Sequence, residues 1–146
     1  MVVVSDHLSD MDDQMRADHG LDVQPRPTAE NDLPSAHDLA IEYMTERWRP
    51  GPIDELEDTS LFFMKRDLTE MFVVLCGGLE NAVAEMEKRK EFGLRKYGTH
   101  LQPFKGRDSL ADARDEIGDA VVYVMTEVFE RAHQKLALQT EEDSDE

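Results

Sequence analysis

Cysteine and basic residues are scarce in this chain of 146 residues. The single cysteine, Cys76, cannot form a disulfide within the chain, which argues against a disulfide-stabilised secreted domain and favours a reducing compartment. Lysine and arginine together number 16 against 33 aspartates and glutamates, so the formal net charge is -17. Nucleic-acid backbones and anionic membrane surfaces repel such a chain, and we expect direct binding to neither.

Long hydrophobic runs are also missing. No apolar stretch approaches the ~20 residues of a membrane span, and the start MVVVSDHLSDMDD lacks the basic residues and the longer apolar run of a signal peptide. We therefore expect a cytoplasmic protein without a membrane partner.

The composition divides the chain into three regions. Residues 1–33 are acidic, poor in large apolar residues and broken by Pro25 and Pro27, so we predict a disordered arm. Residues 34–138 form the predicted helical domain, and residues 139–146 form an acidic tail.

The absence of alternating strand patterns predicts an all-α fold. A first helix through LAIEYMTERW is capped by Ser35 or Asp38 and ends before Pro50-Gly51-Pro52. A second helix runs from about Asp67 to Tyr97, because apolar residues recur there at three- and four-residue steps.

Two glycines and one aspartate mark helix boundaries. Gly77-Gly78 interrupts the second helix and predicts a kink, a close helix crossing or a break into two helices. Asp108 is the expected N-cap of a third helix that reaches at least Ala132.

Acidic residues recur at helical spacing on the second and third helices. With about 100° of rotation per residue, one edge of the second helix carries Glu80, Glu87 and Glu91. One edge of the third helix carries Asp112, Glu116, Asp119 and Tyr123. Both edges border apolar stripes, so the two edges face one another if the helices pack together.

Four of these acids, Glu87, Glu91, Glu116 and Asp119, are the candidate catalytic residues and metal ligands. Carboxylates brought together repel one another unless a cation neutralises them, and oxygen ligands suit Mg²⁺ or Mn²⁺. A bound divalent ion would bridge phosphate oxygens and activate a water, which predicts hydrolysis of a phosphoanhydride. The alternative is that these acids form solvated helix faces, since so many acids align at helical spacing by chance.

The segment between the two acidic edges is basic and aromatic, which composition alone does not require. Its candidate substrate-binding residues are Arg95, Lys96, Tyr97, Lys105 and Arg107, joined by Tyr123 on the third helix. Arginine matches phosphate oxygens in bidentate fashion, so Arg107 is a strong candidate for contact with a phosphate chain. Tyr97 and Phe104 are either base-stacking residues or core residues.

The stretch EFGLRKYGTHLQPFKGRDSLADARDEIGDAVVYVM resembles the region shared by phage-encoded MazG-like nucleotide pyrophosphohydrolases, and the likeness covers roughly residues 80–132. The wider superfamily pairs E-x-x-E on one helix with E-x-x-D on the next, and Glu116-Ile-Gly-Asp119 matches the second pair. The first pair departs from the pattern: the candidates are Glu80, Glu85, Glu87 and Glu91, of which we prefer the last two.

The resemblance implies an all-α helical bundle, completed as a homodimer or homotetramer, that hydrolyses nucleoside triphosphates to monophosphate and pyrophosphate with Mg²⁺ or Mn²⁺. The basic turn is most similar to phage enzymes of the MazZ type, which implies purine dNTP substrates such as dGTP or dATP. A phage-encoded protein would act in the host cytoplasm, where it would adjust the nucleotide pool. Two further hypotheses are a noncatalytic acidic protein that mimics DNA or blocks a host factor, and a purely structural helical protein.

Overall fold

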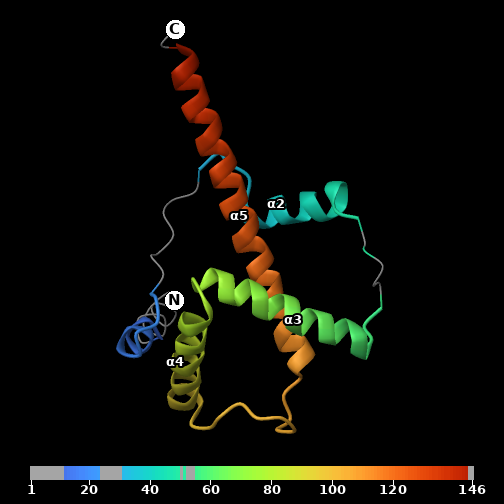
Figure 1. The fold of residues 1–146 in the computed structure, drawn as a ribbon, viewed down its shortest axis with the longest axis vertical. Coiled ribbons are helices and arrows are strands. Elements are labelled where there is room, and N and C mark those ends of the chain that lie inside the picture. Colours follow the sequence, from blue (N-terminus) through green and yellow to red (C-terminus); the bar gives the residue numbers. More distant parts are fainter. Residues whose placement is uncertain (1–11, 24–30, 50, 52–54, 145–146) are drawn as a thin grey trace, which may run out of the picture. The chain divides into compact units, whose positions relative to one another are not determined.

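The computed structural model describes residues 12–23, 31–49, 51 and 55–144, and all regular structure within these ranges is helical (Figure 1). This confirms the predicted all-α class. The chain divides into two compact units. The first comprises Met1–Thr28 and Ile53–Lys105, and the second comprises Ala29–Pro52 and Gly106–Glu146.

In the first unit, helix α3 (Asp58–Leu75) begins well before the predicted start at Asp67. Ser60 fixes this earlier start, because its hydroxyl accepts a hydrogen bond from the Glu57 backbone N–H at 3.3 Å and donates to the Glu55 carbonyl at 3.0 Å. Four consecutive apolar residues, 61–64, hide the three- and four-residue period that would have revealed this first part of the helix.

The two adjacent glycines end α3 and open α4 (Leu79–Tyr97). Gly77 and Gly78 have positive φ angles of 78° and 131°, which side chains rarely allow. Their N–H groups donate to the carbonyls of Val74 and Val73, at 3.1 Å and 3.0 Å respectively, in a Schellman motif. Of the three predicted alternatives, the break into two helices is therefore the observed one.

Residues 12–18 form a further helix of the first unit, beside α4 (Figure 1). Leu21, which follows it, is only 5% exposed. This part of the chain differs from the disordered arm that its composition predicts. The remainder of that arm, residues 1–11 and 24–30, lies outside the described residues, as do Pro50 and Pro52.

In the second unit, helix α2 (Ala36–Glu42) continues into the π-helical turn η1 (Tyr43–Arg47) and packs against α5 (Figure 1). The Ser35 hydroxyl accepts a hydrogen bond from the Asp38 backbone N–H at 3.1 Å, which identifies Ser35 as the N-cap. Ala40 is only 3% exposed, because a small side chain permits close approach of the two helices.

Helix α5 (Ser109–Ser144) is much longer than the minimum predicted. Asp108 is its N-cap as expected, since its Oδ1 accepts a hydrogen bond from the Ala111 N–H at 3.1 Å. The backbone remains helical into the predicted acidic tail, whose last two residues lie outside the described range. Among the described helices, none is both long and apolar enough to cross a membrane.

Candidate functional site

The first acidic pair lies one turn apart on α4. Glu87 and Glu91 are both exposed, and Glu87 Oε2 lies 3.8 Å from Lys90 Nζ. Glu85, an alternative ligand, instead accepts a hydrogen bond from Arg89 Nε at 3.1 Å, and its side chain is 27% exposed. It lies about 200° around the helix from Glu87. The intrahelical pair with Arg89 accounts for Glu85 as a helix-stabilising residue.

The second acidic pair, Glu116 and Asp119, lies one turn apart on α5, and both residues are exposed. The two pairs belong to different units. The structure therefore places each pair on its own helix, and convergence of all four carboxylates stays a prediction. Among the described residues, no group of three or more His, Cys, Asp or Glu residues is gathered as a metal site.

At the start of α5, Arg107 is in direct contact with Asp112. Arg107 Nε donates to Asp112 Oδ2 at 3.0 Å, and Arg107 Nη2 donates to Asp112 Oδ1 at 2.8 Å. This two-bond pairing holds the guanidinium over the first turn of the helix. Asp112 lies on the same edge as Glu116 and Asp119, so the arginine borders the acidic edge within one unit.

Sequence spacing placed Asp112 on this edge but did not identify it as the partner of Arg107. A local signal for that pairing was present. Once Asp108 is recognised as the N-cap, the Arg107 side chain precedes the helix by one residue and reaches an acid in the first turn.

Lys96, near the end of α4, is already engaged with an acid. Its Nζ donates to Asp12 Oδ1 at 2.8 Å, across 84 positions of the sequence. This hydrogen bond is the main reason that the pKa of Lys96 is raised above its ordinary value, and the charge of Asp12 adds to it. The sequence contains no signal for this pairing, because it depends on the docking of a remote segment.

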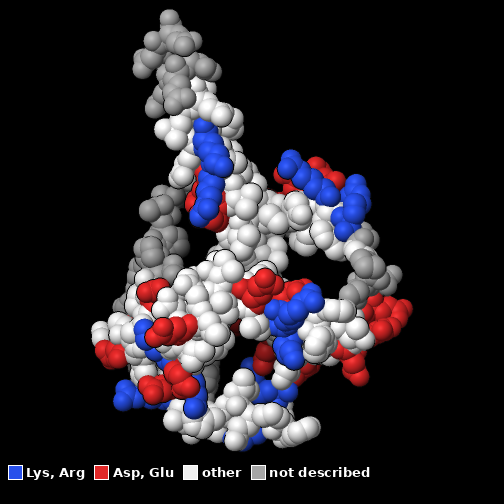
Figure 2. Space-filling model, viewed as in Figure 1, with Lys and Arg blue, Asp and Glu red and all other residues white. Residues whose placement is uncertain are grey.

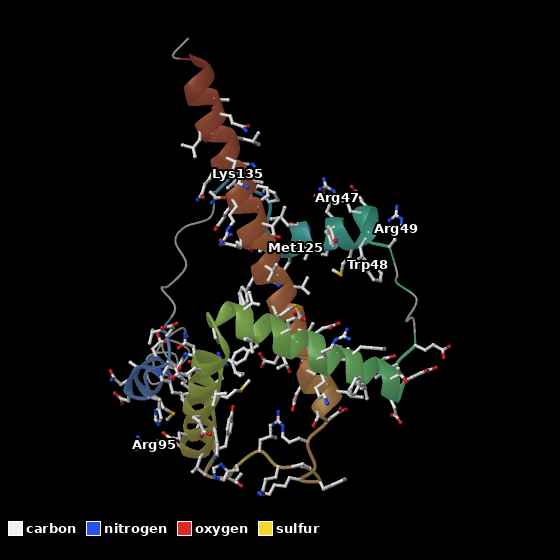
Figure 3. All side chains as sticks on the ribbon, in the orientation of Figure 1. Arg47, Trp48, Arg49, Arg95, Met125 and Lys135 are labelled. Atoms are coloured by element: carbon white, nitrogen blue, oxygen red, sulfur yellow. The ribbon has the colours of Figure 1, made fainter. Side chains whose placement is uncertain are left out.

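Arg95 lines a shallow pocket of about 310 Å³ with Gln14, Met15, Asp18 and His19. Figure 3 shows Arg95 in the C-terminal part of α4, on the side where residues 12–18 lie. The predicted phosphate-binding cations Arg95 and Lys96 therefore both border residues 12–21, which we call the N-terminal segment.

The loop after α4 presents the remaining candidates of the first unit. Gly98 ends α4 with a left-handed φ of 71°, and its N–H donates to the Leu94 carbonyl at 2.8 Å. Lys105 Nζ donates to Thr99 Oγ1 at 2.9 Å, which bridges the two ends of the loop.

Three aromatic side chains near the predicted site are exposed. Phe104 has a positive φ of 61° and is fully exposed, while Tyr97 and Tyr123 are each 70% exposed. None of these side chains is buried in a core, so each retains a free ring face for stacking.

Comparison with protein-family models, with curated proteins and with solved structures finds no match to this chain. No family membership is assigned on those grounds.

Proposed function

We propose that this protein is a metal-dependent pyrophosphohydrolase of nucleoside triphosphates, built like the MazG-like enzymes and acting on purine dNTPs such as dGTP or dATP. The observation that supports the proposal most directly is the arrangement of side chains at the start of α5. There Arg107 is held by two hydrogen bonds beside the edge that bears Glu116 and Asp119. A guanidinium beside a row of carboxylates combines a phosphate-binding cation with potential metal ligands. Metal-assisted hydrolysis of a phosphoanhydride uses both kinds of group.

The donor set fits a small, hard divalent cation. Glu87, Glu91, Glu116 and Asp119 provide only carboxylate oxygens, which Mg²⁺ and Mn²⁺ accept as ligands. One pair belongs to each unit, so a site built from all four requires the two helices to meet. When bound, the cation supplies charge neutralisation for the phosphates and a water of lowered pKa.

The basic residues would bind and orient the phosphate chain. Arg107 is the preferred phosphate ligand, because a guanidinium can pair with two phosphate oxygens as it pairs here with the two carboxylate oxygens of Asp112, which a phosphate would replace. Lys96 and Lys105 are point charges on flexible stems, while Arg95 lies at the pocket beside the N-terminal segment. Tyr97 and Tyr123 offer exposed rings that would stack on the base.

We further propose that the bundle is completed as a homodimer or homotetramer in the cytoplasm. The support is a group of large apolar side chains on neighbouring parts of α3 and α4, each more than half exposed: Val74, Leu75, Leu79, Val83 and Met86. Burial of such side chains between subunits would remove apolar surface from water, which stabilises an assembly.

Product analysis tests the reaction. The full chain is incubated with each common NTP and dNTP in the presence of Mg²⁺ or Mn²⁺, with EDTA controls, and the products are separated by chromatography. We expect metal-dependent release of monophosphate and pyrophosphate, fastest with purine deoxynucleotides. Release of orthophosphate, or no turnover of any nucleotide, would reject the proposed reaction.

A noncatalytic acidic protein that mimics DNA is the second candidate. It is favoured by the pairing of two candidate cations with aspartates, Lys96 with Asp12 and Arg107 with Asp112, which leaves the net negative charge dominant. This candidate predicts binding to a basic host protein that is weakened by salt and indifferent to neutral substitutions at Lys96 and Arg107.

A further inference from the structure

Residues 12–21, here the N-terminal segment, are attached to α4 at both of their ends. At one end Asp12 pairs with Lys96 at 2.8 Å. At the other end Lys88 Nζ donates to the Gly20 carbonyl at 3.3 Å. Leu21, at the end of the segment, is only 5% exposed. The segment is thus docked along more than two turns of α4.

Phe92 lies between these two attachment points and is contacted by three polar side chains. The His19 ring meets the Phe92 ring edge to face, with centroids 5.9 Å apart and an interplanar angle of 83°. The Arg16 guanidinium carbon lies 5.9 Å from the Phe92 centroid, and Lys96 Nζ lies 5.5 Å from it. Both cations are within the range of cation–π attraction.

The contact at Lys96 places an anionic oxygen on a candidate phosphate ligand. A carboxylate oxygen of Asp12 accepts from the ammonium group at the distance at which a phosphate oxygen would accept. Lys96 keeps a 37% exposed side chain and Asp12 a 40% exposed one, so the ion pair is accessible to solvent and to competing anions. Such exposed pairs are weak, and a ligand that carries several negative charges can displace the carboxylate.

Acids of the N-terminal segment lie near two candidate phosphate ligands. Figure 2 shows acidic and basic side chains interspersed around α4 and residues 12–18. Asp18 of the N-terminal segment and Arg95 of α4 line the same pocket, so a second acid of the segment lies near a second candidate phosphate ligand.

We propose that the N-terminal segment is an autoinhibitory cover, in which the Asp12 carboxylate occupies Lys96 and competes with the phosphates of the substrate. The cover opens when a polyphosphate displaces Asp12, and the remaining contacts at Phe92 and Lys88 keep the segment beside α4. This inference rests on the proposed function, because it requires that Lys96 be a phosphate ligand.

The first measurement tests the docking without any turnover. Lysine amines of the full chain are acetylated under limiting conditions, and the labelling of each lysine is read by mass spectrometry. Asp12→Asn removes the carboxylate whose hydrogen bond, and in addition whose charge, raises the pKa of Lys96, so a larger fraction of its amine becomes neutral and reactive. We expect labelling of Lys96 to rise about two- to fivefold, the equilibrium change that an exposed ion pair supports, while labelling of Lys90 stays constant.

Asp13→Asn is the matched control, since it removes the same charge from the neighbouring residue but leaves the Asp12–Lys96 bond in place. Equal Lys96 labelling in wild type, Asp12→Asn and Asp13→Asn would overturn the docking and with it the cover.

The second measurement tests the competition. In Asp12→Asn, but not in Asp13→Asn, we expect KM for the dNTP substrate to fall by about two- to fivefold, again the range of one exposed ion pair, with kcat unchanged. Affinity for inorganic triphosphate, measured by calorimetry, should rise by the same factor. If no variant turns over any nucleotide, the proposed function fails while the triphosphate titration still decides the competition. If Lys96 labelling rises but neither KM nor triphosphate affinity changes, the cover is overturned.

Discussion

At the residue scale, two basic candidates of the site, Lys96 and Arg107, differ in how they contact acids. Arg107 donates two hydrogen bonds to Asp112, whereas Lys96 donates a single hydrogen bond to Asp12. The arginine is therefore fixed in orientation and the lysine is held by one flexible contact. Under the proposed function this difference predicts different tasks: Arg107 would set the position of a phosphate, and Lys96 would be the cation for which the substrate and Asp12 compete.

Substitution of Arg107, whose guanidinium donates two parallel hydrogen bonds, gives the first test at the residue scale. Arg107→Lys keeps the charge and removes the bidentate geometry, so we expect kcat/KM for the dNTP substrate to fall about tenfold, the effect of one strong hydrogen bond. Arg114→Lys is the control, because Arg114 is a neighbouring exposed arginine whose contact is with Asp115 at 3.5 Å. Equal activity of the two variants would remove Arg107 from the site.

The second acidic pair provides a test of metal binding. Glu116→Gln and Asp119→Asn remove anionic oxygens without changing the apolar stripe of α5, so we expect turnover to fall at least about 100-fold while helical circular dichroism is unchanged. Loss of groups that only support metal ligands already costs about 10- to 100-fold. Asp115→Asn, which neutralises an exposed acid of the same helix, should retain wild-type activity. Wild-type rates in Glu116→Gln and Asp119→Asn would eliminate this pair as the metal site.

At the element scale, the helix boundaries follow from short-range chemistry that is visible in the sequence. Ser35 and Asp108 cap their helices through side-chain oxygens, and the Gly77-Gly78 pair ends α3 through a Schellman motif. The apolar pattern of the sequence did not predict the first part of α3, because the consecutive apolar residues there show no helical period. The acidic edge of α4 begins only after the glycine break, so that break sets the direction in which Glu87 and Glu91 are presented.

The glycine break gives an element-scale prediction. Alanine at Gly77 must adopt a φ of 78°, which costs about 1–2 kcal/mol in a residue with a side chain. We expect Gly77→Ala to lower the free energy of unfolding by that amount in urea titrations. Gly93→Ala is the control within α4, where a Cβ meets no atom within 4 Å. There we expect a gain of about 0.5–1 kcal/mol, because alanine loses less conformational entropy in a helix. Equal effects at the two positions would contradict the role assigned to Gly77.

At the scale of the whole molecule, the net negative charge bears on the proposed metal ion, and the exposed apolar surface bears on the proposed oligomer. The net charge is -17, and several cations are already paired with acids: Arg66 with Asp67, Arg89 with Glu85, and Arg131 with Glu127. An anionic substrate is repelled by this net charge, which is the physical reason for including a divalent ion in the proposed reaction. The exposed apolar group on α3 and α4 is the corresponding reason for proposing an oligomer.

The oligomer is tested by charge insertion. Val83→Glu places a carboxylate within the exposed apolar group, so we expect the assembly to dissociate toward monomers in light scattering coupled to size-exclusion chromatography. Ala84→Glu adds the same charge about 100° around α4 and should leave the assembly intact. A wild-type chain that is monomeric at all accessible concentrations would exclude the proposed assembly.

The sequence by itself determined the all-α class, the cap at Asp108 and an interruption at Gly77-Gly78, because each depends on hydrogen bonds between residues a few positions apart. The candidate acids were placed on their helix edges for the same reason. The sequence left the cap of the first helix open between Ser35 and Asp38, and the structure identifies Ser35. Only the tertiary structure decided that Asp12 reaches Lys96 and that Leu21 is buried. Composition predicted that this region could not bury enough surface to order itself, whereas it is held by contacts with α4, whose residues lie far along the chain.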